Sequence, residues 1–532
     1  MQKFWRRGEP FVWATGLTLS TIIIMTALLI YVVIANGIGV FWPRQLVRLA
    51  LNDGRAVMGE VTAENDGAGK GKRLQLKIGN RDLNGLDFTW VNESEIAERS
   101  HPDDAYVLER QEYGNFFGFL IEVHTPDRTL TAADGDLDAA LIKARLDAEP
   151  LLAAGKRINE AFAQINLTIE ELDQAIAKHR YRGVTDQDER IAKLAREKEG
   201  QKGRFDALLA ERQGNSQSLA AFNAVFRTAD GREATIPVAN MVRVYRPNAM
   251  SLGQKITHYG GKLTELFLAE PRESNTEGGL FPAIFGTVML VLLMSLLSFP
   301  LGVIAGIYLR EYAHAGIMVK IVRIAVNNLA GIPSIVYGIF GLGFFVYGVG
   351  GAIDSLFFPE RLPAPTFGTG GILWASLTLG LLTIPVVIVA TEEALGAIPP
   401  AVREGSLALG ATKFQTLTRL LLPMASPGIM TGFILAMARA AGEVAPLMIT
   451  GVVKLAPALP LDGQFPYLHL NRKFMHLGFH IYDIGFQSPN VEAAKPMVYV
   501  TTLLLILIVL LLCSVAIRLR NIMRQRYAVA DV

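Results

Sequence analysis

The sequence predicts a polytopic α-helical membrane protein with an α+β domain inserted between its first and second membrane spans. Two observations lead to this fold class. Six stretches are long and apolar enough to cross a bilayer, and the first stands far from the other five. The intervening segment, residues 40–279, is rich in Lys, Arg, Asp and Glu, as an ordinary soluble domain is.

A transmembrane helix needs about 20 apolar residues to cross a hydrocarbon core of about 30 Å. The stretches of this kind lie at roughly 11–35, 280–309, 321–348, 371–391, 428–451 and 495–517. The first follows the basic run MQKFWRR and could be mistaken for a signal peptide. It is too long for one and shows no small-residue cleavage site, so we interpret it as a membrane anchor.

The basic residues of the short flanks predict the orientation. One side of the membrane receives Lys3, Arg6, Arg7, Arg310, Lys320, Arg323, Arg403, Lys413, Arg419, Arg518, Arg520, Arg524 and Arg526. The other side receives only Arg361, Lys454, Arg472, Lys473 and Lys495. Because basic residues concentrate in cytoplasmic loops, both termini and residues 392–427 are predicted to be cytoplasmic. Residues 40–279 and 452–494 are then periplasmic.

Residues 40–279 combine two kinds of pattern. Short β-type runs such as RLQLKIGN and FFGFLIEV occupy 45–130, and similar runs return in 221–246. Between them, at about 136–222, a coiled-coil seam is predicted by Ile158, Phe162, Ile165, Ile169, Leu172 and Ile176. The break at RGVTDQD (182–188) predicts an antiparallel helical hairpin inside a β-rich domain. The seam is either the hairpin's own interface or a docking surface for a partner protein.

Composition and motifs argue against several classes of protein. A formal net charge of +2 is unlike that of a nucleic-acid binder, which needs a concentrated basic face. The run GAGKGKR (67–73) departs from a Walker A motif, because Asp66 and Arg73 replace its first Gly and its Ser or Thr. We therefore expect no catalytic residue, no cofactor and no metal site, and any ATP-driven work falls to another subunit. The single cysteine, Cys513, lies in an apolar run and has no intrachain partner.

Residues 391–429, TEEALGAIPPAVREGSLALGATKFQTLTRLLLPMASPGI, predict two short helices joined by a glycine; we call this segment the elbow. Pro399 and Pro400 suit the start of the first helix, where the missing N–H groups would be unpaired anyway. Gly410 suits its end, because glycine adopts the left-handed conformation readily. The second helix, ATKFQTLTRLLL, is expected to end at Pro423.

Two opposite charges lie within the fifth span, GIMTGFILAMARAAGEVAPLMITG. Arg439 and Glu443 stand at i and i+4, so a continuous helix would place them on one face. A charge at mid-bilayer costs about 2.5–3.5 kcal/mol on insertion scales, and pairing lowers that cost. The pair is either a structural ion pair or part of a translocation path. In the second case the guanidinium binds an oxyanion such as phosphate through parallel hydrogen bonds.

The third span, IVRIAVNNLAGIPSIVYGIFGLGFFVYG, supplies neutral hydrogen-bonding groups. The candidates for the same path are Asn327, Asn328, Ser334 and Tyr337. Pro333 and the glycines at 331, 338, 341 and 343 predict a kinked and closely packed helix. Arg323 lies near the cytoplasmic end of this span, and we interpret it as a topology anchor.

The elbow resembles the EAA loop of ABC importer permeases. Glu404-Gly405-Ser406 takes the E-A-A place, Gly410 is the loop glycine, and Leu422-Pro423 closes the motif. Gly and Ser replace the two alanines but keep the small side chains that close helix docking requires. In that family the loop transmits ATP-driven closure of the ATPase subunits to the membrane helices. The resemblance implies coupling residues Arg403, Glu404, Gly405, Ser406, Gly410 and Pro423.

Four stretches together look like the PstA-type permease of the phosphate ABC importer. They are EGGLFPAIFGTVMLVLLMSLLSFPLGVIAGIYLREYA, GIPSIVYGIFGLGFF, the elbow and ARAAGEVAPLMITG, and they cover most of 277–517. The resemblance implies a heterodimer with a PstC-type permease, a PstB-type ATPase dimer and a PstS-type periplasmic phosphate-binding protein. It also places Arg439 and Glu443 at charged positions of the phosphate path. The common form of the family lacks an insertion such as 40–279.

The resulting prediction is a non-catalytic permease subunit of the bacterial inner membrane, surrounded by lipid, that imports phosphate with ATP used by a partner. The alternatives are a permease for another oxyanion or small solute, and a membrane signalling protein with a periplasmic sensor. The expected division of the chain is 1–39 (cytoplasmic N-terminus and first span), 40–279 (insertion), 280–517 (permease core of five spans) and 518–532 (cytoplasmic tail).

Overall fold

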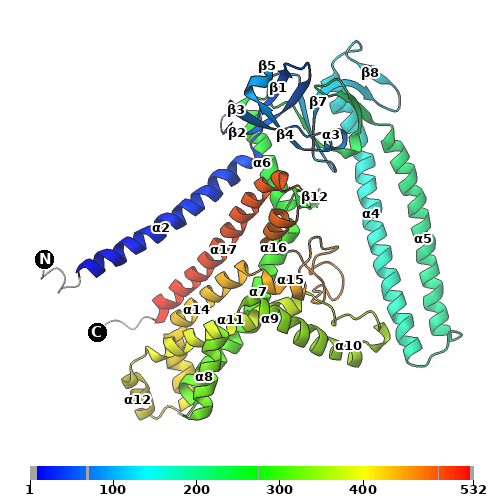
Figure 1. The fold of residues 1–532 in the computed structure, drawn as a ribbon. Helices are drawn as coiled ribbons and strands as arrows, with labels where there is room; N and C mark the ends of the chain where they lie inside the picture. Colours follow the sequence, from blue (N-terminus) through cyan, green and yellow to red (C-terminus); the bar gives the residue numbers. More distant parts are fainter. Residues whose placement is uncertain (1–8, 68–70, 273–274, 315, 489, 528–532) are drawn as a thin grey trace.

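The computed structural model describes residues 9–67, 71–272, 275–314, 316–488 and 490–527. They form a sheet-rich part, a long helical hairpin and a bundle of apolar helices (Figure 1). The predictions that concern Lys3, Arg6, Arg7, residues 528–532 and residues 68–70 of GAGKGKR lie outside the described residues. The flanks of that last run form the ends of two paired strands, β2 and β3.

The sheet-rich part contains two larger antiparallel sheets. The first has the strand order β4-β3-β2-β1-β5, with β1 (Leu46–Leu51), β2 (Ala56–Gly67), β3 (Gly71–Lys77), β4 (Phe88–Asn92) and β5 (Ile96–Ser100). The second has the order β10-β9-β7-β6-β11 with β8 beside β7. Its strands are β6 (Tyr106–Arg110), β7 (Asn115–His124), β8 (Thr129–Thr131), β9 (Asn223–Arg227), β10 (Glu233–Pro237) and β11 (Met241–Tyr245). Because β9 pairs with β7 across the intervening helices, the hairpin is an insertion within one sheet.

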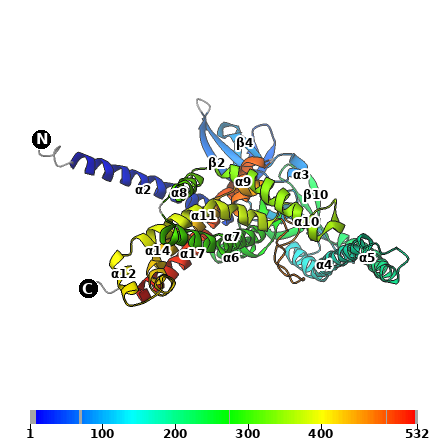
Figure 2. The ribbon, with the colours of Figure 1, turned by 90° about the horizontal axis from the view of Figure 1, so that it is seen from below.

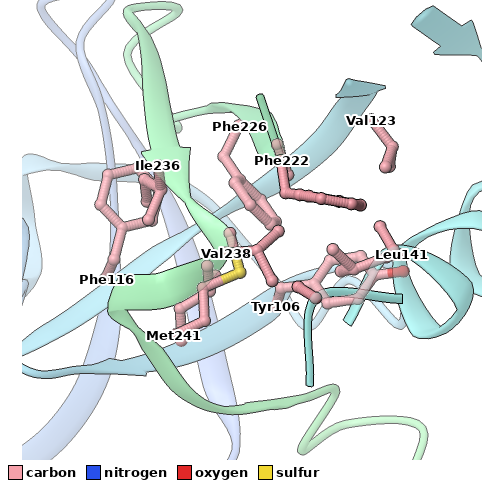
Figure 3. Packing of buried hydrophobic residues seen from close by; sticks show 13 residues of the cluster. Tyr106, Phe116, Val123, Leu141, Phe222, Phe226, Ile236, Val238 and Met241 are labelled. Carbon is pink, nitrogen blue, oxygen red and sulfur yellow. The ribbon is translucent and has the colours of Figure 1, made fainter. Parts of the chain in front are cut away.

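Aromatic side chains form the centre of the second sheet's core (Figure 3). Phe226 packs edge-on against both Tyr106 and Phe116, with ring centroids 6.0 Å apart in each case. Leu141, from the first helix of the hairpin, closes the same core. Because successive side chains of a strand point to opposite faces of a sheet, residues two apart, such as Ala224 and Phe226 of β9, share the face that carries this core. The base of the hairpin is thereby fixed to the sheet.

Arg110 forms a buried ion pair beside this core. Its guanidinium donates two parallel hydrogen bonds to Asp82, at 2.9 and 3.0 Å, and is only 5% exposed. Burial alone raises the pKa of Asp82, but the hydrogen bonds and charge of Arg110 outweigh it and lower the pKa. The pair therefore stabilises the fold above the ordinary carboxyl pKa of about 4, and this stability is lost as the pH falls through the lowered value.

We expect Asp82→Asn to destabilise the sheet-rich part by about 1–3 kcal/mol at pH 7, because a buried guanidinium loses its charged partner. The difference from the wild type should shrink below about pH 4, where the unfolded carboxyl takes up a proton, and disappear as the pH falls through the lowered pKa of Asp82 in the folded protein. Thermal unfolding of the full chain in detergent at pH 7 and pH 3 measures both effects. Asp53→Asn breaks the exposed Asp53–Arg55 pair and serves as the control. Equal losses in the two variants would contradict the prediction.

The predicted hairpin is formed by α4 (Leu137–Tyr181) and α5 (Glu189–Ala220). Asp136 and Asp188 cap their N-termini by accepting hydrogen bonds from the backbone two residues later. The seam residues Ile158, Phe162, Leu172 and Ile176 are buried, and the Phe162 and Phe205 rings lie 4.8 Å apart. The seam is thus used within the hairpin, and the turn falls at 182–188 as predicted.

The hairpin extends from the sheets towards α10 and reaches the end of α10 that is farther from the apolar bundle (Figure 1). Two polar contacts join α4 to loops of the bundle. Gln174 accepts a hydrogen bond from Arg361 at 2.5 Å, and Gln164 accepts one from Gln464 at 2.9 Å. These loops join the third span to the fourth and the fifth span to the sixth. The insertion therefore touches the permease-like region at two separate places.

Six helices of the described residues are long and apolar enough to span a membrane, as predicted. The first, second, fourth and sixth segments are α2 (Glu9–Ile38), α7 (Phe281–Ile307) with the π-helical turn η5 (Tyr308–Tyr312), α11 (Ile372–Gly396) and α17 (Val491–Tyr527). The third consists of α9 (Ser334–Phe340), η6 (Gly341–Gly350) and α10 (Gly351–Phe357), and the fifth of α13 (Lys413–Thr416), η8 (Leu417–Leu421) and α14 (Leu422–Gly442). Shorter elements are α3 (Arg81–Asn84), α6 (Leu252–Leu268), α8 (Ile317–Leu329), α12 (Pro400–Ala408), α15 (Ala445–Thr450), α16 (Leu477–Tyr482) and the strand pair β12 (Pro271–Arg272) and β13 (Glu277–Gly278).

The third span begins later than predicted. Residues 321–329 belong to the separate helix α8, and the spanning helix starts at Ser334. Pro333 has extended backbone (φ −56°, ψ 136°), and proline disfavours helix in the residue before it, so the chain breaks here instead of kinking. Close packing is found at Gly338 and Gly341, where a Cβ would approach Pro446 and Thr378 within 3 Å. Gly343 has no such neighbour.

The fifth span is also displaced from its predicted range. Its helix runs from Lys413 to Gly442, so Pro423 does not end it. A π-helical turn, Leu417–Leu421, precedes the proline, and the N–H of Leu422 bonds the carbonyl of Leu417. This wider turn relieves the clash between the proline ring and the carbonyl four residues earlier. At the far end the helix stops before Glu443, whose backbone is extended (φ −80°, ψ 135°).

Helices α7 and α11 form the centre of the bundle. Gly302 and Gly306 of α7 face Val387 and Thr391 of α11 so closely that a Cβ would lie 2.7 Å from either side chain. Small residues permit this approach, as is typical of membrane helices. Helix α2 contacts α17 and projects from the side of the bundle (Figure 2). Its apolar side chains are mostly exposed. Such a surface is suited to lipid.

Candidate functional site

Arg439 and Glu443 form a loose ion pair at the end of α14. The Nε of Arg439 lies 3.6 Å from Oε1 of Glu443, which is too long for a hydrogen bond. The two side chains are 35% and 22% exposed. The sequence predicted that the two residues share one face of a continuous helix. This prediction is wrong, because α14 ends at Gly442 and Glu443 follows it in extended backbone. Within the described residues the guanidinium makes no hydrogen bond, so its N–H donors can bind an anion.

Tyr337 lies near Arg439, close enough for the two groups to interact electrostatically. Its ring is buried, and its hydroxyl donates a 2.7 Å hydrogen bond to the carbonyl of Leu329 across the break in the third span. That carbonyl belongs to the last turn of α8, where helix carbonyls lack intrahelical partners. Tyr337 therefore ties α8 to the spanning helix beside Arg439.

The other polar candidates of the third span are less closely involved. Ser334 is the first residue of α9 and is partly exposed. Asn327 and Asn328 lie on α8 with exposed side chains, outside the spanning helix. Within the described residues no hydrogen bond or ion pair joins these three side chains to Arg439, whereas Tyr337 interacts with it electrostatically.

The first elbow helix, α12, is short as predicted, whereas the second continues from Lys413 into the fifth span. Helix α12 ends before Gly410, which has a left-handed backbone (φ +85°), and Thr412 caps α13 in a capping box with Gln415. Ser406 and Thr416 join the two helices through a 2.9 Å hydrogen bond between their hydroxyls. The corner is thus fixed by a glycine conformation and a cross-helix contact.

Arg403 faces inward from α12. It donates hydrogen bonds to the carbonyls of Leu395 and Ile398 at the end of α11 and to Glu311 at 2.9 Å. The adjacent Glu404 and Gly405 are exposed on the outer side of the helix. Among the predicted coupling residues, Arg403 therefore holds the elbow in place, and Glu404 and Gly405 belong to its free surface.

Exposed apolar side chains mark the outer surface of the elbow. Leu409 is 91% exposed and Phe414 is 66% exposed, on either side of Gly410. Neither was predicted as a site residue. They lie at the opposite end of the bundle from the sheets (Figure 1). Exposed side chains of this size at a rigid corner are typical of a protein–protein contact.

Sequence reasoning also missed Glu311, Glu392 and the role of Arg323. Arg323 pairs with Glu392 of α11 at 3.0 Å and donates to the carbonyl of Leu309, so it does more than anchor topology. Glu311 is the partner of Arg403, 92 residues away in the chain. A charged residue near a span end looks like an anchor in the sequence, and only the fold reveals its partner.

Comparison with known proteins identifies the helical region. Residues 298–529 match the sequence profile of the binding-protein-dependent transport system inner membrane component family. A probable phosphate transport system permease protein, PstA, of Methanocaldococcus jannaschii is 34% identical over 221 residues, which are 41% of this chain and 67% of that protein. The PstA of Yersinia pestis is 34% identical over 222 residues, covering 42% and 66%. The probable permease YqgH of Bacillus subtilis is 34% identical over 194 residues, covering 36% and 59%.

Two solved transporters are more distant. The MetNI methionine ABC transporter shows 20% identity and a TM-score of 0.34, over 46% of this chain and 95% of the matched chain. A bacterial alginate ABC transporter shows 17% identity and a TM-score of 0.33, over 50% and 82%. At these scores the likeness says nothing about how the helices of this chain are arranged. None of these matches extends over the whole chain.

Proposed function

We propose, from the premise that the chain belongs to the binding-protein-dependent transport inner membrane components and is a PstA-type permease, that it forms part of the translocation path for inorganic phosphate. It is a multi-pass inner-membrane protein of an ABC importer. The likeness to relatives named as phosphate permeases is the observation that carries the substrate assignment.

The chemistry of Arg439 supports an oxyanion. A guanidinium offers five N–H donors in a planar fork that matches phosphate oxygens bidentately. In this chain the nearest carboxylate, Glu443, is 3.6 Å away and takes no hydrogen bond from it. Glu443 lowers the cost of the charge within the membrane while the donors stay available. Phosphate can therefore accept hydrogen bonds from the guanidinium N–H groups of Arg439, which donate none to Glu443.

The elbow is the proposed link to the ATPase. Leu409 and Phe414 enter a groove of a PstB-type ATPase, and Glu404 and Gly405 lie along the same surface. The elbow and both termini are then cytoplasmic, whereas residues 40–279 and 452–494 are periplasmic. A PstC-type permease completes the path, and a PstS-type binding protein delivers phosphate to the outer mouth. ATP hydrolysis belongs to the ATPase, and this chain contributes no catalytic residue.

Competition uptake tests the substrate. Cells or vesicles that hold the chain with its co-purifying partners should take up radiolabelled phosphate, and excess arsenate should suppress that uptake. Arsenate has nearly the same shape and charge as phosphate, whereas sulfate carries no proton at neutral pH. We expect sulfate to compete at least tenfold less well. Strong competition by sulfate with weak competition by arsenate would assign the chain to another oxyanion.

A further inference from the structure

We propose that the π-helical turn Tyr308–Tyr312 is the structural hub through which the elbow moves the membrane helices, and that Glu311 is its positioning residue. This inference rests on the proposed role of the elbow in ATPase coupling and names residues that carry it further. The turn ends α7, which packs closely against α11 at Gly302 and Gly306. It lies at the elbow end of the bundle (Figure 1).

Four consecutive residues of the turn contact four different elements. The carbonyl of Leu309 accepts a hydrogen bond from Arg323 of α8 at 3.0 Å. The guanidinium of Arg310 covers Gly396 at the end of α11, within 3.1 Å of where a Cβ would stand. Glu311 accepts from Arg403 of α12 at 2.9 Å. The ring of Tyr312 lies under Lys413 of α13, with the ammonium 4.8 Å from its centroid.

The π-helical geometry explains how one short turn reaches so many neighbours. A π turn widens the helix and rotates successive side chains out of the usual 3.6-residue pattern. Adjacent residues therefore point to partners that a regular α-helix would place on other turns. Such turns are rare in proteins at large and are frequently found at functional sites.

Glu311 is the member of this group whose loss has the largest effect. Its carboxylate side chain is 11% exposed and Arg403 is 21% exposed, so the pair is partly shielded from water. Arg403 also bonds the carbonyls of Leu395 and Ile398, which fixes α12 to α11. With Glu311 in place, a displacement of α12 is passed to α7 and α11 together. Without it, α12 keeps its hydrogen bond to α11 through Arg403 and to α13 through Ser406, but loses its charged link to the end of α7.

The test compares Glu311→Gln and Glu311→Asp in the complete complex with its ATPase and binding protein. We expect both variants to assemble and hydrolyse ATP. In Glu311→Gln the phosphate taken up per ATP hydrolysed should fall at least tenfold, because the movement no longer reaches α7. Glu311→Asp keeps the charge and should recover most of the coupling. Glu393→Gln removes an exposed carboxylate near the end of α11 and should behave as the wild type.

A second readout does not depend on the substrate. Leu435 is exposed on α14, one turn before Arg439, and a single cysteine placed there in a Cys513→Ser background reports movement of the path. ATP with vanadate should change its maleimide labelling rate in the wild type but not in Glu311→Gln. If the wild type takes up no phosphate yet shows this change, the substrate assignment fails while the hub is still tested.

Three results would overturn the hub. One is normal coupling and normal ATP-driven labelling in Glu311→Gln. Another is an equal defect in Glu393→Gln. The third concerns the case in which Glu311→Gln does not assemble. The charge-swapped double variant, Glu311→Arg with Arg403→Glu, is then tested in its place. The hub is supported if the swapped variant assembles and again shows the ATP-driven change in maleimide labelling rate. It is overturned if the swapped variant fails to restore assembly or fails to restore that change.

Discussion

Arg439→Gln is expected to abolish phosphate uptake while the complex assembles normally. Glutamine is shorter than arginine; it keeps some hydrogen-bonding capacity but removes the charge that attracts the anion within the membrane. Loss of one charge-assisted, bidentate contact is worth at least tenfold, and a site that holds a single guanidinium should lose considerably more. Uptake of radiolabelled phosphate, normalised to the amount of purified complex, measures the effect. Arg518→Gln removes an arginine from the end of another span and is the matched control.

The double variant Arg439→Gln with Glu443→Gln separates transport from structure. If the two residues serve only as an ion pair, each single change leaves a charge without its partner, and the double change restores assembly and uptake. If Arg439 binds the passing anion, the double variant assembles but stays inactive. We expect the inactive double variant. Its recovery to near wild-type uptake would make the pair purely structural.

Leu409→Asp combined with Phe414→Asp is expected to release the ATPase from the membrane complex. Both side chains are exposed at the corner of the elbow, where a partner groove would exclude water from them. Burying a carboxylate there costs several kcal/mol, enough to lower affinity more than a hundredfold. Co-purification of the ATPase with the affinity-tagged permease measures this directly.

Leu86→Asp provides the control for the elbow variant, because Leu86 is 67% exposed in the sheet-rich part. It introduces one aspartate, against two in the elbow variant, at a comparably exposed apolar residue at the other end of the molecule. We expect ATPase recovery to match the wild type. Retention of the ATPase by the elbow variant, with this control unchanged, would rule out Leu409 and Phe414 as the contact.

Hydrophobic length and helical spacing were sufficient to predict six spans and the hairpin. The seam at Ile158 and Phe162 is buried because its period of alternating four and three residues matches helical packing. The predicted starts of two spans were wrong. The third span begins later than predicted, at Ser334 after Pro333, and the fifth begins earlier, at Lys413 before Pro423. One proline separates α8 from the spanning helix, whereas the other is absorbed by a π turn that no spacing rule reveals.

The candidate site was predictable only where its charge was conspicuous. Arg439 and Glu443 are noticeable because charges in an apolar run are costly. Glu311 has no such signal, since a charged residue at the end of a span is commonplace, and its partner Arg403 lies far along the chain. Tyr337 was found by its polarity, but its bond across the break depends on where α8 ends.

The two hydrogen bonds between α4 and the loops of the bundle have a mechanical consequence. Gln164 and Gln174 are ten positions apart on one helix, which fixes them about 15 Å apart along its axis. The loops that contain Arg361 and Gln464 are therefore held at a fixed separation by α4, whose base packs against the second sheet. They can separate further only by breaking one of these bonds or by bending α4. The insertion sets an upper limit on how widely the two loops part.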